Sequence, residues 1–492
     1  MARRYVRRSP RDQCDDDDDE VEHTSMGGYA GSHPARTAGA LFRWVVGVDT
    51  QAVVAATPAH RDRYVDLLRA AAILAVVTGH YLAAAVIVQD GRLGGINALE
   101  VLPWARPLTW LFQVMPVFFL VGGYANAASW SSHQRRGGAG VSWVRSRMFR
   151  LLRPTAVFVV VLAGVAGLGR AVGLDPDIVA DAAWVAAIGL WFLAVYIAVV
   201  ALAPIVISWQ RRWGHGRTIV LLVAWVAVAD LSRLVFEVSY FAWSTYFVAW
   251  LVVHQLGVAW RDQVLTGSRW TAWVLFGGGV LSLLLLTGLG PYAVSMVGTV
   301  GAGLATTAPP TLALLALAAT QTGLILLLRD PVERWLAKPR PWTAVVAINS
   351  VVLTIYLWHM VPIVVVAPAL VRTGVLPQYP IGSAAWLLLR LPWLLSLAIV
   401  LILLVAVFAR GERTRRRGAE ATHFNDSSPW AKTRLAGGVL LCLAGLTGLA
   451  ATSFAGLAPT VVPIVELTAL ATGLLLVGLR VPIIGRLRVR RS

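Results

Sequence analysis

The sequence contains few residues of the kinds that bind metals or cross-link chains. It has two cysteines in 492 residues, Cys14 in a polar segment and Cys442 within an apolar run. Two isolated cysteines provide neither a disulfide framework nor the spaced ligands of a zinc site. No Gly-rich phosphate loop follows a predicted strand, so no flavin, nicotinamide or nucleotide site is indicated. We therefore predict no metal site and no tightly bound cofactor.

Charged residues are also scarce, at 14% of the chain, whereas 57% of the residues are hydrophobic. The mean hydropathy is +0.68. These values are typical of a membrane protein and set aside the soluble domains that the length alone would suggest. The net charge of +18 does not indicate nucleic-acid binding, because the arginines lie between apolar runs instead of forming one basic face.

Apolar runs long enough to cross a bilayer recur along the chain from Asp66 onward. They predict an all-α fold, a polytopic transmembrane helix bundle of about ten core spans plus about two C-terminal spans. The predicted spans are 65–88, 106–129, 155–174, 184–207, 218–237, 241–259, 270–289, 309–328, 344–368, 384–408, 435–456 and 460–479.

The segments around these spans predict the domain organisation. Residues 1–40 are too polar and charged to fold around a core, and we expect a disordered cytoplasmic tail without a secretory signal peptide. The further predicted units are a juxtamembrane segment at 41–64, a ten-span membrane domain at 65–408, a basic cytoplasmic linker at 409–434, a two-span appendage at 435–480 and a basic cytoplasmic tail at 481–492.

Positive charges alternate between the two sides of the predicted bundle. Alternate loops carry clusters of arginine, within 135–153, 211–217, 261–269, 329–340 and 410–434. The other loops carry only Arg92, Arg372 and acidic or Gly/Pro-rich segments. Because Lys and Arg accumulate in cytoplasmic loops, we predict a multi-pass protein of the plasma membrane with both termini in the cytoplasm.

The first predicted span carries ionisable residues on one face. Arg69 and His80 are eleven residues apart, which on a helix places both side chains on one face and about 16 Å apart along the axis. Asp66 precedes Arg69 by three residues and can pair with it. If the span 65–88 crosses the bilayer, His80 reaches mid-membrane depth, where a polar group is costly unless it faces a protein cavity. A neutral imidazole can take a proton from a hydroxyl, so His80 is a candidate general base, with a structural role as the alternative.

The spacing of Arg69 and His80 resembles the signature of acyltransferase family 3, integral-membrane O-acyltransferases that act on polysaccharides, lipids and natural products. Further stretches are similar to the same family: 115–124, 147–154, 190–193 and 356–359. The likeness covers about residues 60–410, with the ten-span layout of that family. Gly122 departs from it, since members commonly have serine there.

This resemblance implies acyl-CoA as a co-substrate on the cytoplasmic side and an acceptor often reached from the outer leaflet or beyond. It implies that His80 is essential for transfer, with Arg69 beside it. The candidate substrate-binding residues are Asp66, Tyr124, Arg147, Arg150, Arg153, Asp230, Arg233 and His359. The three arginines from 147 to 153 could bind the phosphates of coenzyme A or act as headgroup anchors. Asp230 and Arg233 could line the acceptor side or neutralise each other, and His359 could be a core histidine.

We therefore predict a membrane O-acyltransferase of the cell envelope. It would move an acetyl or similar group from acyl-CoA to a hydroxyl of a saccharide, lipid or secondary-metabolite acceptor. Two alternatives stay open. A secondary transporter or exporter of a hydrophobic metabolite fits the number of spans, but no inverted repeat is visible. A catalytically inactive membrane scaffold is possible because a fold does not fix a function.

Overall fold

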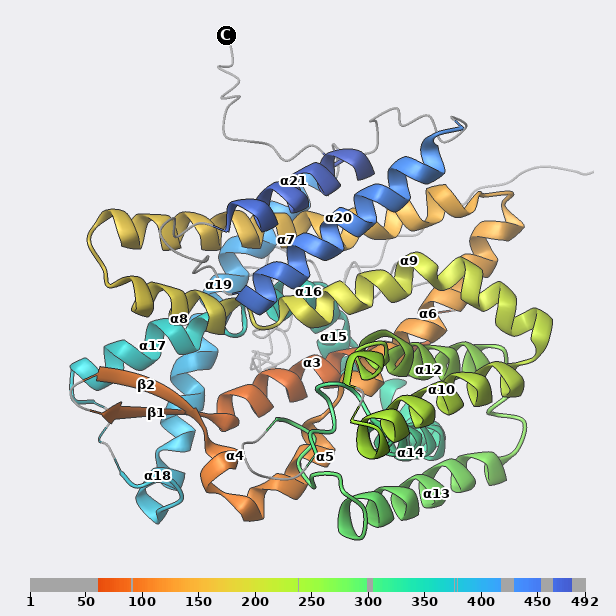
Figure 1. Ribbon diagram of the computed structural model, residues 1–492, viewed down its shortest axis with the longest axis horizontal. Coiled ribbons are helices and arrows are strands. Elements are labelled where there is room, and N and C mark those ends of the chain that lie inside the picture. Colours follow the sequence, from red (N-terminus) through yellow and green to blue (C-terminus); the bar gives the residue numbers. More distant parts are fainter. Residues whose placement is uncertain are drawn as a thin grey trace, which may run out of the picture.

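The computed structural model describes residues 61–89, 92–237, 239–298, 304–375, 377, 379–416, 429–452 and 463–479. The predicted tails, nearly all of the juxtamembrane segment and residues 417–428 of the basic linker lie outside this part of the chain, and the predictions for them stay predictions. Within it the chain is almost entirely helical (Figure 1). The predicted all-α fold class is confirmed.

Ten helical segments of the described residues are long and apolar enough to cross a membrane, or up to eleven if a bent pair counts as one span. The long helices are α3 (Arg63–Ala83), α6 (Met115–Arg135), α7 (Gly140–Ala171), α9 (Leu190–Trp213), α10 (His215–Val235), α12 (Thr245–Arg261), α13 (Arg269–Gly288), α14 (Leu312–Leu336), α19 (Arg390–Arg416) and α20 (Ala431–Thr452).

Shorter elements connect these helices or extend them. They are β1 (Ala84–Gln89), β2 (Arg92–Asn97), α4 (Ala98–Val101), the 3-10 helix η1 (Pro103–Leu108), α5 (Thr109–Phe112), α8 (Pro176–Ala187), α11 (Ser239–Ala242), α15 (Pro339–Asn349), α16 (Val352–Trp358), α17 (Val361–Arg372), α18 (Ala384–Leu388) and α21 (Ile464–Val477).

Helix α3 occupies the centre of the bundle (Figure 1). Its first turn is capped by Asp62, whose side chain accepts a hydrogen bond from the backbone N–H of Val65. Tyr64 and Val65 belong to a buried apolar cluster shared with α6, α9, α10, α12 and α14. Val77 and Tyr81 belong to a second cluster, shared with α7, α8, α9, α19, α20 and α21. Both halves of the core therefore pack on α3.

The helices α6 and α12 approach each other at backbone contact. A Cβ atom on Gly123 would lie 1.9 Å from the carbonyl oxygen of His254, and one on Gly257 would lie 1.9 Å from that of Leu120. No side chain fits at either position. Small residues at such crossings are typical of membrane helices, where packing and not hydrophobic exclusion drives association.

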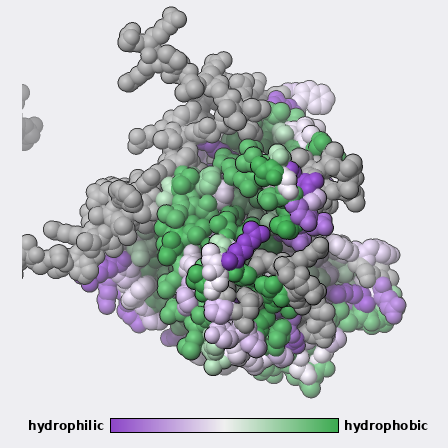
Figure 2. All heavy atoms as spheres, turned by 90° about the vertical axis from the view of Figure 1, so that its left-hand side faces the viewer, coloured by the Kyte–Doolittle hydropathy of each residue, from purple (hydrophilic) through white to green (hydrophobic). Residues whose placement is uncertain are grey.

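The bundle has two ends of different character. The arginine end comprises the loops at 136–139, 214 and 262–268, which lie at the right of Figure 1. There Arg211 of α9 donates to Asp262 over 2.8 and 2.9 Å and to Ser131 over 3.2 Å. The hairpin end comprises β1, β2 and the connections from α7 to α8 and from α17 to α18 (Figure 1). Apolar side chains cover much of this end (Figure 2). The three loops of the arginine end, all predicted to lie on the inside, thus share one end of the bundle.

The first predicted span is wrong in its last turns. Residues 65–88 were expected to form one helix, but α3 ends at Ala83, and residues from Ala84 to Gln89 form β1, paired antiparallel with β2. An apolar run of this length does not distinguish a helix from a strand, and Val86, Ile87 and Val88 favour a strand.

Several other predicted spans have different limits. The segment 106–129 becomes a long helix only at Met115, after η1 and α5. The third span was expected at 155–174, but α7 already begins at Gly140. The last span was expected at 460–479, whereas α21 covers only Ile464–Val477.

The ninth predicted span, 344–368, is not one helix. It is divided into α15, α16 and α17, and α15 and α16 are bent by 54° at Ser350 and Val351. A second break follows Trp358, so His359 and Met360 lie between α16 and α17. Irregular backbone at membrane depth is tolerated where it is buried in protein, and His359 is only 1% exposed.

Candidate functional site

Two histidines that are far apart in the sequence meet at the last turn of α3. The Nδ1 atom of His80 on α3 lies 3.0 Å from the Nε2 atom of His359. The ring centroids are 5.1 Å apart and the planes are inclined by 29°. The ring of His359 is buried, whereas His80 is exposed although it belongs to the central helix. His80 is thus the member of the pair that a substrate can reach.

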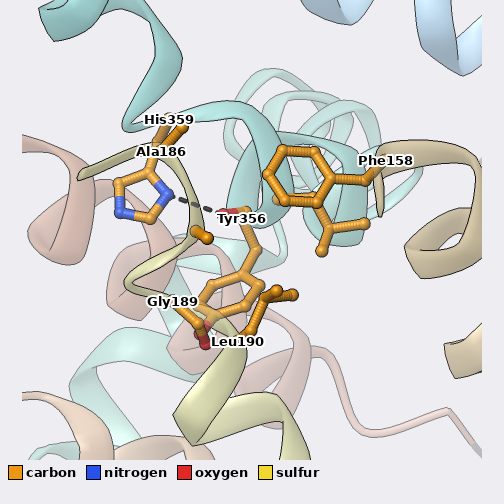
Figure 3. A pocket seen from close by; sticks show the side chains of 8 residues that line it. Phe158, Ala186, Gly189, Leu190, Tyr356 and His359 are labelled. Atoms are coloured by element: carbon orange, nitrogen blue, oxygen red, sulfur yellow. Dashed lines mark hydrogen bonds between the residues drawn. The ribbon is translucent and has the colours of Figure 1, made fainter. Parts of the chain in front are cut away.

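The break between α16 and α17 fixes the orientation of His359. Its Nδ1 atom lies 2.6 Å from the backbone oxygen of Tyr356 (Figure 3). Tyr356 is itself held, because its hydroxyl donates to the backbone oxygen of Gly189 over 2.5 Å. Gly189 lies where α8 gives way to α9, and a helix break leaves carbonyl groups without helical partners. Two helix breaks therefore support the histidine pair.

The hydrogen bonds determine which ring nitrogen carries each proton. A carbonyl oxygen only accepts, so the Nδ1 atom of His359 must donate to the oxygen of Tyr356. With both rings neutral, Nε2 of His359 then accepts from the Nδ1–H group of His80. The Nε2 atom of His80 is left with a free lone pair. This arrangement makes His80 suited to accept a proton from a third group.

A small hollow lies behind His359, lined also by Phe158, Leu190 and Tyr356 (Figure 3). No part of it is wide enough for a water molecule. It cannot hold an acyl donor or an acceptor. Substrate access to the pair is therefore through His80 and not through this hollow.

Arg69 lies on the same helix as His80, toward the arginine end. Its Nη1 atom donates to Oδ1 of Asp66 over 3.0 Å, and the Nε atom of Arg61 lies 2.5 Å from Oδ2. The backbone oxygen of Asp66 accepts from the side-chain amide of Asn349 over 2.8 Å. Asp66 is 5% exposed. Its carboxylate is thus occupied by two guanidinium groups and positions Arg69, as the predicted i,i+3 pair required.

Arg147 belongs to the first part of α7. Its Nη2 atom donates to the hydroxyl of Ser129 on α6, and its guanidinium lies 5.1 Å from the ring of Trp143. The positive charges of Arg150 and Arg69 act on it. Arg69 of α3 and the pair Arg147 and Arg150 of α7, which come from two separate motifs, therefore form one basic cluster. Arg153 follows on α7 and is half-buried.

Tyr124 is not beside the histidine pair. Its hydroxyl donates to Oδ2 of Asp62 over 2.8 Å, and the same oxygen accepts from Arg329 over 2.9 Å. The guanidinium of Arg261 lies 5.8 Å from the tyrosine ring. This polar cluster joins α6, α12 and α14 to the start of α3 at the arginine end.

Asp230 and Arg233 form no ion pair among the described residues. Asp230 is 2% exposed, and its Oδ2 accepts from the hydroxyl of Tyr292 and from the backbone N–H of Leu312, each over 2.8 Å. Arg233 thus acts on Asp230 through its charge without direct contact, and both roles considered for these residues stay predictions. Burial and the negative charge of Asp230 raise the pKa of Tyr292. Asp230 thus connects α10 to the segment before α14. A second hydrogen bond holds this segment, because Nε1 of Trp110 donates to the backbone oxygen of Val294 over 2.7 Å.

His254 is a buried core histidine. Its Nδ1 atom lies 2.9 Å from Oε1 of Gln255, and its Nε2 atom lies 3.2 Å from Nδ2 of Asn126. Gln255 donates in turn to Gln210 over 2.7 Å. This network joins α6, α9 and α12. Among the residues that the structure describes, no three His, Cys, Asp or Glu side chains gather closely enough to hold a metal ion.

Sequence reasoning missed two polar residues near this centre. Ser129 carries no sequence signal, since small polar residues are common in membrane helices. Arg390, at the start of α19, did carry one. It is a positively charged residue near the outer end of the predicted span 384–408, and positive charges are rare on that side, where the loops carry only Arg92 and Arg372.

The fold and this site define a multi-pass membrane protein with a histidine pair inside a helix bundle, at the last turn of α3, and a basic cluster toward the opposite end. Comparison with family models then gives the family. Residues 62–410 match acyltransferase family 3, described as an acyltransferase domain. The match covers well over half of the chain, and the protein belongs to this family, as the resemblance of its motifs predicted. Comparisons with curated proteins and with solved structures found no match.

Proposed function

We propose that this membrane acyltransferase moves an acyl group from acyl-CoA to a hydroxyl of its acceptor, with His80 as the general base. The observation that carries the proposal is the hydrogen-bond chain from His80 through His359 to the backbone oxygen of Tyr356. It leaves the lone pair of His80 Nε2 available on an exposed ring.

The transfer then proceeds by general-base catalysis. The Nε2 atom of His80 takes the proton of the acceptor hydroxyl as its oxygen attacks the thioester carbonyl. The new C–O bond forms, the C–S bond breaks, and the proton passes to the sulfur of coenzyme A. His359 positions His80 and stabilises the positive charge that develops on it, as a third group does in other nucleophile–base arrays.

The basic cluster suits the donor. Arg69 and Arg147 lie toward the arginine end, which we assign to the cytoplasm, and guanidinium groups bind phosphates through charge-assisted hydrogen bonds. Acyl-CoA bound there would extend its thioester along α3. Arg69 and His80 are eleven residues apart, a distance of about 16 Å along a helix. This is long enough to separate phosphate recognition from the reacting carbonyl.

The test is transfer of label from acetyl-CoA labelled in its acetyl group. Membranes that contain the wild-type protein, His80→Ala or Thr78→Ala are incubated with the donor and then separated into lipid and polysaccharide fractions. Thr78 is the matched control because it is exposed on another face of α3. We expect labelled product with the wild type and Thr78→Ala, and a loss of at least about 100-fold with His80→Ala.

Two outcomes contradict the proposal. One is equal labelling by His80→Ala and the wild type. The other is flux of a metabolite across vesicles that requires the protein but not His80, together with no acyl product from acetyl, succinyl or longer donors. The amount of folded protein is compared by gel filtration in detergent, so that a failure of folding is not read as a loss of catalysis.

A further inference from the structure

A buried arginine lies next to the histidine helix at the hairpin end. Arg390 begins α19 and is 9% exposed. Its guanidinium carbon lies 4.0 Å from the ring centroid of Trp386 and 5.4 Å from that of Trp393. The charge is thus held between two aromatic faces and away from water.

The hydrogen-bonding capacity of Arg390 is largely unused. Its Nη1 atom donates to the backbone oxygen of Ala84 over 2.8 Å, whereas its Nε–H group is buried with no partner. The ion pairs among the described residues include none with Arg390. A desolvated guanidinium has five donors and requires an anion or several acceptors. One carbonyl and two aromatic rings satisfy only part of this requirement.

Arg390 is close to His80 in space, although the two residues are far apart in the sequence. The backbone N–H of Ala84, whose oxygen accepts from Arg390, donates to the oxygen of His80. Trp393 Nε1 donates to the backbone oxygen of Tyr81 over 3.0 Å. The first turn of α19 is therefore fastened to the last turn of α3, immediately after His80. Ala84, the hydrogen-bond partner of Arg390, follows His80 by four residues, which on a helix corresponds to a rise of about 6 Å.

The cationic groups near the histidine pair thus lie on two sides of it. Arg69 and Arg147 lie toward the arginine end and suit a donor phosphate. Arg390 lies one helical turn beyond His80 toward the hairpin end. A molecule that binds at Arg390 through an anion can place a nearby hydroxyl at His80 without using the donor cluster.

We propose that Arg390 binds an oxyanion, a phosphate or a carboxylate, of an amphiphilic acceptor that also carries the hydroxyl to be acylated. The assignment of this ligand as the acceptor rests on the proposed function, whereas the binding of the oxyanion does not. The rings of Trp386 and Trp393 hold the guanidinium in place.

Binding is measured with three amphiphiles of equal chain length. Octyl glucuronide carries a carboxylate, octyl glucoside is its neutral counterpart, and octyl phosphate carries a phosphate without a sugar. Thermal unfolding of the full-length protein in dodecyl maltoside is followed for the wild type, Arg390→Gln, Arg390→Lys and Arg372→Gln. Arg372 is an exposed arginine at the same end and serves as the control.

We expect a saturable rise in Tm of a few degrees with octyl glucuronide or octyl phosphate, and none with octyl glucoside. Arg390→Gln abolishes the rise, Arg390→Lys retains part of it, and Arg372→Gln retains all of it. A rise with the phosphate alone identifies a headgroup as the source of the oxyanion, and a rise with the glucuronide alone identifies an acidic sugar.

The proposal is overturned if the neutral glucoside stabilises the wild type as well as the charged amphiphiles do. It is also overturned if the response persists in Arg390→Gln. Should Arg390→Gln fail to fold, Arg390→Lys and the comparison of charged with neutral amphiphiles on the wild type decide the question. Acyl transfer is assayed separately, so oxyanion binding without transfer refutes the proposed function and leaves the Arg390 site standing.

Discussion

The Nδ1 atom of His80 lies 3.0 Å from the Nε2 atom of His359, although 279 positions separate the two residues in the chain. Only one arrangement of protons on two neutral rings fits this contact and the bond to the oxygen of Tyr356. The role of His359 is therefore testable by replacing it with residues that can or cannot accept the hydrogen bond from His80.

We expect His359→Ala to lower kcat by about 100-fold, because His80 loses the group that fixes its tautomer and stabilises its charged form. His359→Gln keeps a side-chain oxygen that can accept from His80, and we expect it to retain more activity than His359→Ala. The measurement is kcat for CoA release, with a thiol reagent, at saturating donor. Equal activities of the two variants at equal folded amounts contradict the role assigned to His359.

The basic cluster makes a prediction about donor affinity. We expect Arg147→Gln to raise KM for acetyl-CoA by about ten-fold, since one charge-assisted hydrogen bond is worth about 1.5 kcal/mol or more. Arg147→Lys should recover part of the loss. Arg212→Gln is the control, because Arg212 is exposed at the arginine end. An equal rise in KM for Arg212→Gln would mean that net charge, and not this position, attracts the donor.

The contact between α6 and α12 predicts a difference between two glycines. A Cβ atom on Gly257 would lie 1.9 Å from the oxygen of Leu120, whereas one on Gly277 would meet nothing within 4 Å. We expect Gly257→Ala to cost about 2 kcal/mol or more, and Gly277→Ala to stabilise α13 by up to about 1 kcal/mol. Thermal unfolding in detergent measures both. Equal Tm values for Gly257→Ala and Gly277→Ala would show that α6 and α12 can move apart without a loss of stability.

The ion pair at the arginine end predicts a dependence of stability on pH. Burial of Asp262 opposes its ionisation, but the hydrogen bonds and charges of Arg211 and His215 outweigh this effect and lower the pKa of Asp262. A carboxyl group whose pKa is lower in the folded state stabilises the protein above the unfolded value, near 4, and loses this effect as the pH falls further.

We therefore expect Asp262→Asn to destabilise the protein by up to about 1 kcal/mol at neutral pH. The difference from the wild type should shrink as the pH falls below about 4. Unfolding is followed at matched ionic strength from neutral to acidic pH. A difference that does not change with pH would assign the effect to lost packing instead of lost charge.

The local pattern of the sequence was sufficient for much of the fold. Helix periodicity placed Arg69 and His80 on one face of α3, and the spacing of Asp66 and Arg69 predicted their contact over 3.0 Å. The length and composition of the apolar runs predicted the polytopic bundle. These properties depend on residues close together in the chain, so they can be read before any tertiary contact is known.

Tertiary structure decided the features that depend on distant residues. The breaks around α16 put His359 against His80, the antiparallel pairing with β2 turned residues from Ala84 to Gln89 into a strand, and the packing of α19 on α3 buried Arg390. Asp230 bonds Tyr292 and Leu312 instead of its neighbour Arg233. In each case a contact between segments far apart in the sequence decides the outcome, and the local pattern cannot reveal such a contact because it reports only on residues close together in the chain.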